Sequence, residues 1–134
     1  MDPNVVKLFQ GKNLVFLATI NSDGSPQLTP VWGNYSDEHI LINTAEGRLK
    51  HKNVQRDPRV AVSVVDHDEP LTMTTIRGKV VQIIPDYDYS HINKLTKQYM
   101  SINEYPYKRE NEKRIIFKIK PEKIFVMPAP NSSV

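Results

Sequence analysis

Short runs of hydrophobic positions, separated by turn residues, extend along most of the chain. Val, Ile, Thr and aromatic residues are concentrated in these runs, which is typical of β-strands. The pair Asp23-Gly24 between the first two runs favours a hairpin, and residues 33–38 are predicted to form a loop. The pattern predicts six strands, over residues 14–20, 25–32, 39–44, 59–66, 71–84 and 113–127.

Prolines and glycines modify three of these predicted strands. Pro26 and Pro30 have no backbone N–H to donate, so parts of 25–32 are expected at a sheet edge or opening. Gly78 predicts a bulge or bend, and Pro121 interrupts the last run. Strands joined by hairpins, without an alternating strand–helix pattern, favour an antiparallel sheet closed into a barrel.

Three other segments have the composition of short helices. Residues 2–10 begin with Asp2, a good N-cap, and stop at Gly11, whereas residues 47–56 are basic and only weakly helical. Residues 86–101 place apolar side chains on one helical face. We therefore expect a mainly β protein with two or three short helices.

Composition places the chain among ordinary globular proteins. Its 134 residues fit one domain, which we assign to residues 1–127, with a tail at 128–134. There is no apolar run of about 18 residues, no signal peptide and no cysteine. We expect a cytoplasmic protein without a membrane partner. The net charge of +3 does not distinguish a nucleic acid from a phosphate-bearing cofactor as partner.

The sequence lacks the motifs of several enzyme classes. It contains no G-x-G-x-x-G, no Walker A lysine and no G-x-S-x-G elbow. No histidine stands at metal-ligand spacing from another, so we expect no metal site and predict that each lies at the surface: His39, His51, His67 and His91. If the protein is an enzyme, a bound cofactor is the economical source of its chemistry.

The most informative stretch runs from Thr44 to Asn53, where a predicted strand passes through a glycine into a basic helical segment. A strand-to-helix turn offers free backbone N–H groups to an anion. Arg48 can bind a phosphate through two hydrogen bonds, Lys50 adds a point charge and the Thr44 hydroxyl can donate. These residues fit a monophosphate site, although spacing alone favours a solvated basic helix face.

A second stretch, residues 27–32, offers a surface for a flat ring. Thr29, Pro30 and Val31 supply apolar area and groups that can meet the polar edge of such a ring. On pattern alone, Leu28 and Trp32 are better explained as core residues.

Taken together, these stretches resemble the pyridoxamine 5′-phosphate oxidase-like, FMN-binding split-barrel family, and most closely its small F420-dependent branch. The similarity extends over residues 5–127. It rests on these motifs in this order: Leu17-Ala18-Thr19-Ile20, Asp23-Gly24-Ser25-Pro26, Thr29-Pro30-Val31-Trp32, Asn43-Thr44, Gly47-Arg48-x-Lys50-x-x-Asn53, Arg56-Asp57-Pro58-Arg59-Val60 and Ile76-Arg77-Gly78-Lys79-Val80-Val81.

The resemblance implies a six-stranded split barrel that forms a homodimer, with cofactor sites at the subunit interface. Arg48 and Lys50 would bind the cofactor phosphate, with Lys52 and Asn53 as helpers. The other implied cofactor-binding residues are Thr29, Pro30, Val31, Trp32, Asn43, Thr44 and Arg77. Arg77 would reach the site or the partner subunit, or else form a structural ion pair. The extra basic segments of classical pyridoxamine phosphate oxidases are absent, which argues against pyridoxal phosphate synthesis.

The resulting functional hypothesis is an oxidoreductase that binds F420 or FMN and transfers a hydride to or from a small organic substrate. A non-catalytic carrier or sensor of the same fold needs the same phosphate site and stays open as an alternative. A nucleic-acid-binding barrel is disfavoured because only 8% of the residues are aromatic and the cations cluster at one strand–helix junction.

Overall fold

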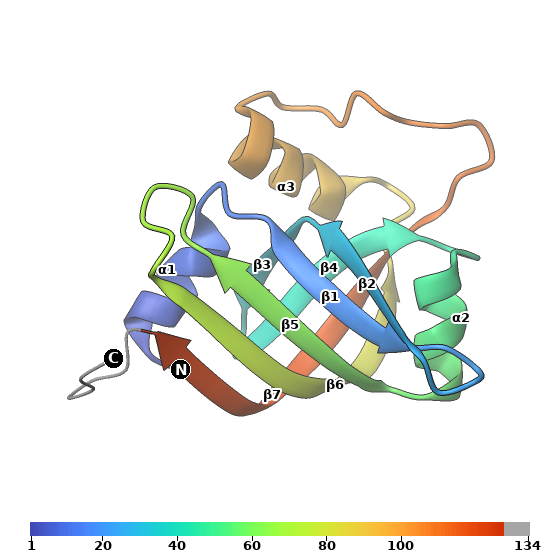
Figure 1. Ribbon diagram of the computed structural model, residues 1–134. Helices are drawn as coiled ribbons and strands as arrows, with labels where there is room; N and C mark the ends of the chain where they lie inside the picture. The colour runs from blue at the N-terminus through green and yellow to red at the C-terminus, as the bar shows by residue number, and fades with distance from the viewer. Residues whose placement is uncertain (128–134) are drawn as a thin grey trace.

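The computed structural model describes residues 1–127, which form seven strands and three helices (Figure 1). In chain order the elements are α1 (Pro3–Gln10), β1 (Val15–Ile20), β2 (Pro26–Val31), β3 (Gly33–Ser36), β4 (His39–Ala45), α2 (Leu49–Arg56), β5 (Arg59–Val65), β6 (Met73–Pro85), α3 (Ser90–Met100) and β7 (Arg114–Met127). The predicted tail, residues 128–134, lies outside the described residues.

The prediction of six strands is wrong, because residues 33–36 form an additional strand instead of a loop. This strand, β3, pairs antiparallel with β4 through a tight hairpin. The two turn residues, Asp37 and Glu38, both have positive φ, at 52° and 61°. Such hairpins usually carry Asn-Gly or Asp-Gly at these positions, so Asp-Glu gives no clear turn signal in the sequence.

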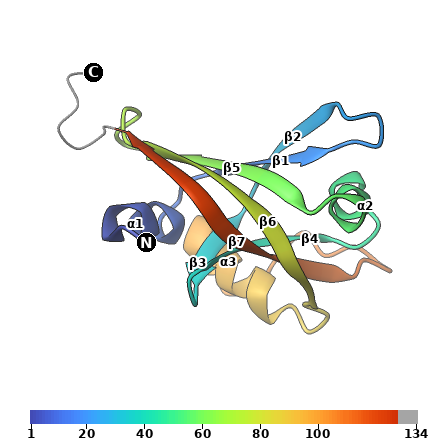
Figure 2. The ribbon, with the colours of Figure 1, turned by 90° about the horizontal axis from the view of Figure 1, so that it is seen from below.

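All seven strands belong to one antiparallel sheet, in the order β2-β1-β5-β6-β7-β4-β3. Although β2 and β3 are its opposite edges, only Trp32 separates them along the chain. One residue bridges only a few ångströms, about 3.8 Å between neighbouring Cα atoms, so the sheet must curl until its edges meet. Figure 2 shows this curl.

The curled sheet is not a closed barrel, which corrects the predicted closure. Within residues 1–127, β2 and β3 do not pair with each other. At the seam, the backbone N–H of Asn43 on β4 donates to the Trp32 carbonyl at 3.4 Å. Because the edge strands do not pair at the seam, side chains can lie there between β2 and β4.

Alternating apolar positions fill the inside of the curl. Leu17, Ile42 and Phe117 are almost fully buried there, and Phe9 of α1 packs with them. Helices α1 and α2 lie at opposite ends of the curl, and α3 lies outside it (Figures 1 and 2). The predicted N-cap of the first helix is confirmed, since the Asp2 side chain accepts from the Asn4 N–H at 2.8 Å.

Gly78 lies at a bulge between β6 and β7, as predicted. The pairing register shifts between Arg77 and Gly78, and Gly78 lies opposite Pro121. A Cβ atom on Gly78 would collide with the Lys120 carbonyl oxygen, so only glycine permits this close approach. Because the bulge accommodates the proline, β7 continues through Pro121.

Candidate functional site

A pocket of about 190 Å³ opens at the seam of the sheet. Strands β2 and β4, the start of α2, helix α3 and the loop before β7 all contribute to it. The lining residues are Pro30, Val31, Trp32, Asn43, Thr44, Arg48, Lys50, Ile92, Tyr105, Tyr107 and Arg114. Seven of these are among the eleven site residues expected from the sequence.

Three cations lie at this pocket: Arg48, Lys50 and Arg114. Lys50 is only 8% exposed and has no ion-pair partner within residues 1–127. Its burial, and then the charges of Arg48 and Arg114, lower the pKa of the Lys50 amine. A buried cation without a counter-ion is costly, so this arrangement favours binding of an anion.

The Thr44 hydroxyl gives an independent indication of a polar ligand. Thr44 is 1% exposed and lines the same pocket. Its Oγ1 is the sole buried side-chain oxygen or nitrogen atom of residues 1–127 that has no hydrogen-bond partner. Since buried polar groups are nearly always paired, this hydroxyl is suited to a ligand that enters the pocket.

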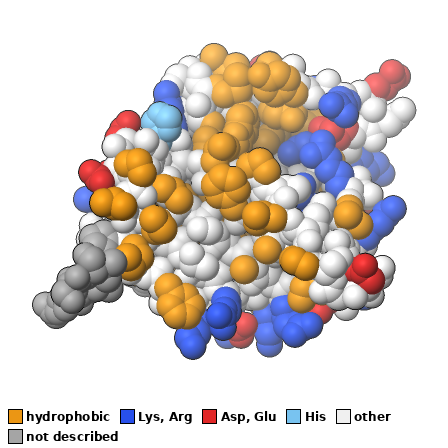
Figure 3. All heavy atoms as spheres, in the orientation of Figure 1, with side chains coloured by type: hydrophobic (Ala, Val, Ile, Leu, Met, Phe, Trp, Pro, Cys, Tyr) orange, Lys and Arg blue, Asp and Glu red, His pale blue; other side chains and the backbone are white. Residues whose placement is uncertain are grey.

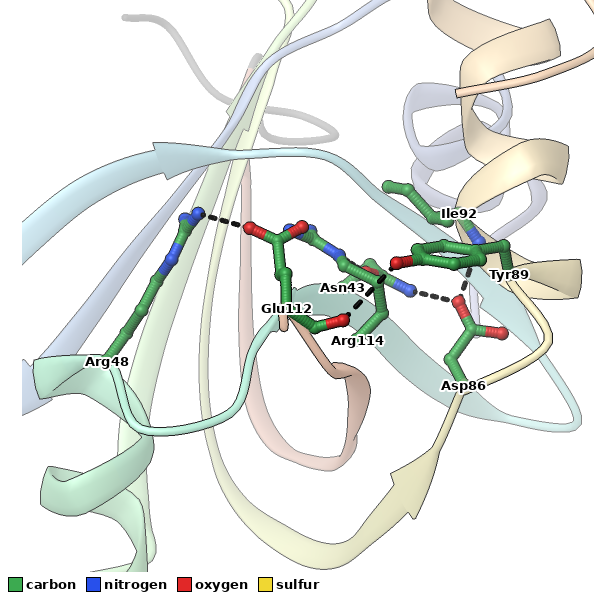
Figure 4. Close-up of polar contacts among 7 residues, drawn as sticks. All are labelled: Asn43, Arg48, Asp86, Tyr89, Ile92, Glu112 and Arg114. Atoms are coloured by element: carbon green, nitrogen blue, oxygen red, sulfur yellow. Dashed lines mark hydrogen bonds and ion pairs between the residues drawn. The ribbon is translucent and has the colours of Figure 1, made fainter. Parts of the chain in front are cut away.

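Asn43 connects the pocket to a buried polar network (Figure 4). Its Oδ1 accepts from Arg114 Nε at 2.9 Å, and its Nδ2 donates to Asp86 Oδ2 at 2.9 Å. Asp86 also accepts from the backbone N–H groups of His91 and Ile92, at 2.8 and 3.0 Å. One carboxylate therefore joins the start of α3 to the strand that carries Asn43 and Thr44.

The same network fixes the state of His91. Asn43 Nδ2 also donates to His91 Nδ1 at 2.9 Å, so the proton of a neutral ring is on Nε2, which donates to Asn34 Oδ1 at 2.9 Å. Burial lowers the pKa of His91 to about 4, although Asp86 opposes the shift. The prediction that all four histidines lie at the surface is wrong for His91 and for His51, whose Nδ1 accepts from the Gly47 N–H.

We expect acid to destabilise the fold through His91. His91 takes up a proton near pH 6.5 in the unfolded chain and only near pH 4 in the folded protein. The stability that comes from the neutral ring is therefore present above pH 6.5 and is lost as the pH falls from 6.5 to 4. The free energy of unfolding should fall by about 2 kcal/mol between pH 7 and pH 5 from this group alone. Urea unfolding at both values checks this. His91→Gln should remove the dependence, and His67→Gln, at an exposed position, should retain it.

Aromatic rings form one wall of the pocket. Trp32 and Tyr99 stack with centroids 5.1 Å apart and an interplanar angle of 3°. Tyr105 meets Trp32 edge-on at 6.4 Å, and Arg114 lies over the Tyr105 ring at 5.2 Å. The Tyr99 hydroxyl donates to the Asn13 carbonyl at 2.7 Å, so Tyr99 supports Trp32 from behind. The wall can accept a flat ligand beside the cations.

The other four expected residues lie outside the pocket lining. Thr29 is on β2, next to the lining residue Pro30. Lys52 and Asn53 line a separate cavity beside the β1–β2 turn, where Asn53 Nδ2 donates to Thr19 Oγ1 and Asn21 Oδ1. Arg77 is on β6, where its guanidinium lies over the Phe125 ring at 5.6 Å.

The site residues that the sequence prediction missed are Ile92, Tyr107, Tyr105 and Arg114. Arg114 pairs with Ala45 in the β4–β7 register, which brings it beside Asn43 and Thr44. The sequence does not reveal how β4 and β7 pair, so nothing in it indicated that Arg114 lies at the site.

Fold and site together define a class of protein: a curled antiparallel sheet with a pocket at its seam that is lined by three cations. The sequence profile described as pyridoxamine 5′-phosphate oxidase matches residues 1–127. The chain belongs to this family, which confirms the resemblance seen in the sequence.

Several solved structures of other proteins share this fold. An F420 reductase is similar at a TM-score of 0.83 and 27% identity, over 93% of this chain and 98% of that one. A conserved hypothetical protein of Mycobacterium tuberculosis matches at 0.70 and 24% identity, over 100% and 91%. HupZ of Group A Streptococcus matches at 0.64 and 17% identity, over 95% and 94%.

Two negative findings apply to residues 1–127. They contain no helix that is long and apolar enough to cross a membrane. They also contain no group of three or more His, Asp or Glu side chains placed to hold a metal ion.

Proposed function

We propose that the pocket binds the phosphate of F420 or FMN, and that the protein is an oxidoreductase acting on a small organic substrate. The observation that carries this proposal is that the Thr44 hydroxyl and the Lys50 amine line one pocket and, within residues 1–127, have no hydrogen-bond partner and no ion-pair partner, respectively. A phosphate accepts hydrogen bonds from both groups and from Arg48. The likeness to an F420 reductase, at 27% identity over nearly all of both chains, supports testing F420 first.

The residues at the seam fit the parts of such a cofactor. Arg48, Lys50 and Thr44 would hold the phosphate, and the wall at Trp32 and Tyr105 would lie beside the ring. When bound, the cofactor would supply the hydride chemistry. The contribution of the protein is to bind and orient it and to keep water from one side.

Binding to wild-type protein tests this function directly. We expect F420 or FMN to bind with micromolar or lower Kd, and its phosphate-free counterpart (a phosphate-free deazaflavin, or riboflavin) at least a hundredfold more weakly. Fluorescence titration gives both values. Equal affinity for the two forms would contradict a phosphate site. Oxidation of the bound reduced cofactor by organic acceptors would then separate an enzyme from a carrier.

Thr44→Val tests the observation on which the proposal depends. Valine has nearly the same shape but lacks the hydroxyl, so the cofactor should bind about tenfold more weakly. The free protein should become more stable, by about 1 kcal/mol, because a buried unpaired hydroxyl is removed. Titration and urea unfolding measure the two effects. Thr75→Val, at an exposed position on β6, is the control.

We also propose that two copies associate through the outer face of β1, β2 and β5. Phe16, Ala18 and Ile20 point outward from β1, and Leu28, paired with Ala18, is 65% exposed. Figure 3 shows hydrophobic side chains gathered over this face. The pocket volume of about 190 Å³ is below the roughly 300–1,000 Å³ of typical cofactor pockets, so a second copy would complete the site.

Light scattering checks the association. We expect twice the mass of the chain for wild type, and a shift to the single chain for Leu28→Glu. Leu71→Glu changes a leucine that is 73% exposed in the β5–β6 loop, and it should remain dimeric. A wild-type protein that stays monomeric at high concentration would contradict the shared site.

A further inference from the structure

Glu112 is a buried carboxylate placed between two of the pocket cations. It lies near the end of the loop that connects α3 to β7, and its side chain is only 8% exposed. Oε1 accepts from Arg114 Nη1 at 3.1 Å, and Oε2 lies 3.5 Å from Arg48 Nη2 (Figure 4). The backbone of Glu112 is fixed as well, since the Tyr89 hydroxyl donates to its carbonyl at 3.3 Å.

The two arginines depend on Glu112 to different degrees. Arg114 is buried, and Asn43 and the Tyr105 ring also hold it. Arg48 has a half-exposed side chain, at 44%, and Glu112 is its one ion-pair partner within residues 1–127. Arg48 is therefore the cation that can turn from the carboxylate to a ligand.

We propose that Glu112 is a positioning residue that competes with the ligand phosphate for Arg48 and thereby sets the affinity of the pocket. In the free protein, Glu112 offsets one of the three positive charges and holds Arg48 beside the pocket. When a phosphate arrives, Arg48 exchanges one anion for another. The carboxylate then repels the phosphate at short range, which keeps binding reversible. This inference rests on the proposed phosphate site.

The test uses the Glu112→Gln variant and the cofactor, F420 or FMN, that wild type binds. It measures the affinity of the variant for this cofactor and for the phosphate-free counterpart of the cofactor. Glutamine retains the shape but removes the charge. We expect the phosphate-bearing form to bind about tenfold more tightly than to wild type. The phosphate-free form should bind within twofold of wild type, because a purely structural effect would change both. Glu110→Gln removes the same charge from an exposed position of the same loop and should change neither.

Glu112→Asp provides a second variant should the glutamine variant not fold. The aspartate side chain is shorter, so it should lose the longer of the two contacts, the one to Arg48 at 3.5 Å, while the negative charge remains. We expect about threefold tighter binding of the phosphate-bearing form, since Arg48 is released. Weaker or unchanged binding in the folded variants overturns the role of Glu112 but leaves the phosphate site intact. A wild type that does not prefer the phosphate-bearing form overturns both.

Discussion

Replacing Arg48 and Lys50 together by alanine is expected to weaken binding of the phosphate-bearing cofactor about a thousandfold. Each charge-assisted hydrogen bond to phosphate contributes about 1.5–3 kcal/mol, so losing two costs about 4 kcal/mol. Both side chains line the pocket, and Lys50 has no ion-pair partner within residues 1–127 to compensate. Fluorescence titration of the double variant measures the loss.

The fold should survive this double substitution. Removing a buried cation that lacks a counter-ion relieves an electrostatic cost, so we expect the melting temperature of the free protein to stay the same or rise. Lys52→Ala is the matched control, because Lys52 lies on the same helix but lines the cavity at the β1–β2 turn. If the Lys52 variant loses as much affinity as the double variant, the phosphate site lies elsewhere.

Replacing Asp86 by alanine is expected to lower the free energy of unfolding by about 3–5 kcal/mol. The carboxylate is 2% exposed and accepts from the Asn43 side chain and from two backbone N–H groups of α3. Alanine would leave the buried N–H groups of His91 and Ile92 without this acceptor, and Asn43 Nδ2 would keep only its bond to His91 Nδ1. Urea unfolding at pH 7 measures the loss.

Asp88→Ala is the control for this prediction. Asp88 lies two residues away and accepts from the Ser90 N–H at 3.1 Å, but it is exposed. Its loss should cost about 1 kcal/mol or less, as for an ordinary helix cap. Equal losses in the two variants would mean that Asp86 acts as a cap alone and that its bond to Asn43 contributes nothing.

Strands made of short runs rich in β-branched and aromatic residues were predictable, because such a run is local to the sequence. The runs at 14–20 and 59–66 correspond closely to β1 and β5. The sequence also predicted the bulge at Gly78, since a glycine inside a strand usually marks one. It did not predict β3, because the hairpin turn has Glu38 at the position where glycine usually follows Asp.

The residues proposed to bind phosphate could be predicted only in part. Thr44, Arg48 and Lys50 follow one another through a strand–helix junction, but their spacing alone favoured a solvated helix face. The family resemblance marked them as one site, and all three line the pocket. Lys52 and Asn53 belong to the same motif, yet they line another cavity, because successive residues of a helix point in different directions.

The mainly β class, most of the strands and the basic stretch at residues 44–53 could be read from the sequence alone, since each depends on residues close together in the chain. Tertiary structure was needed to show that β2 and β3 are opposite edges meeting at Trp32. It was also needed to show that Arg114 and Asp86 contact Asn43 and that Glu112 pairs with Arg48. These arrangements depend on strand order and register over separations of more than forty residues. In the part of the chain that the structure describes, the basic stretch recognised in the sequence thus became part of a pocket with a hydroxyl and a lysine that lack partners and with Glu112 as an internal counter-ion.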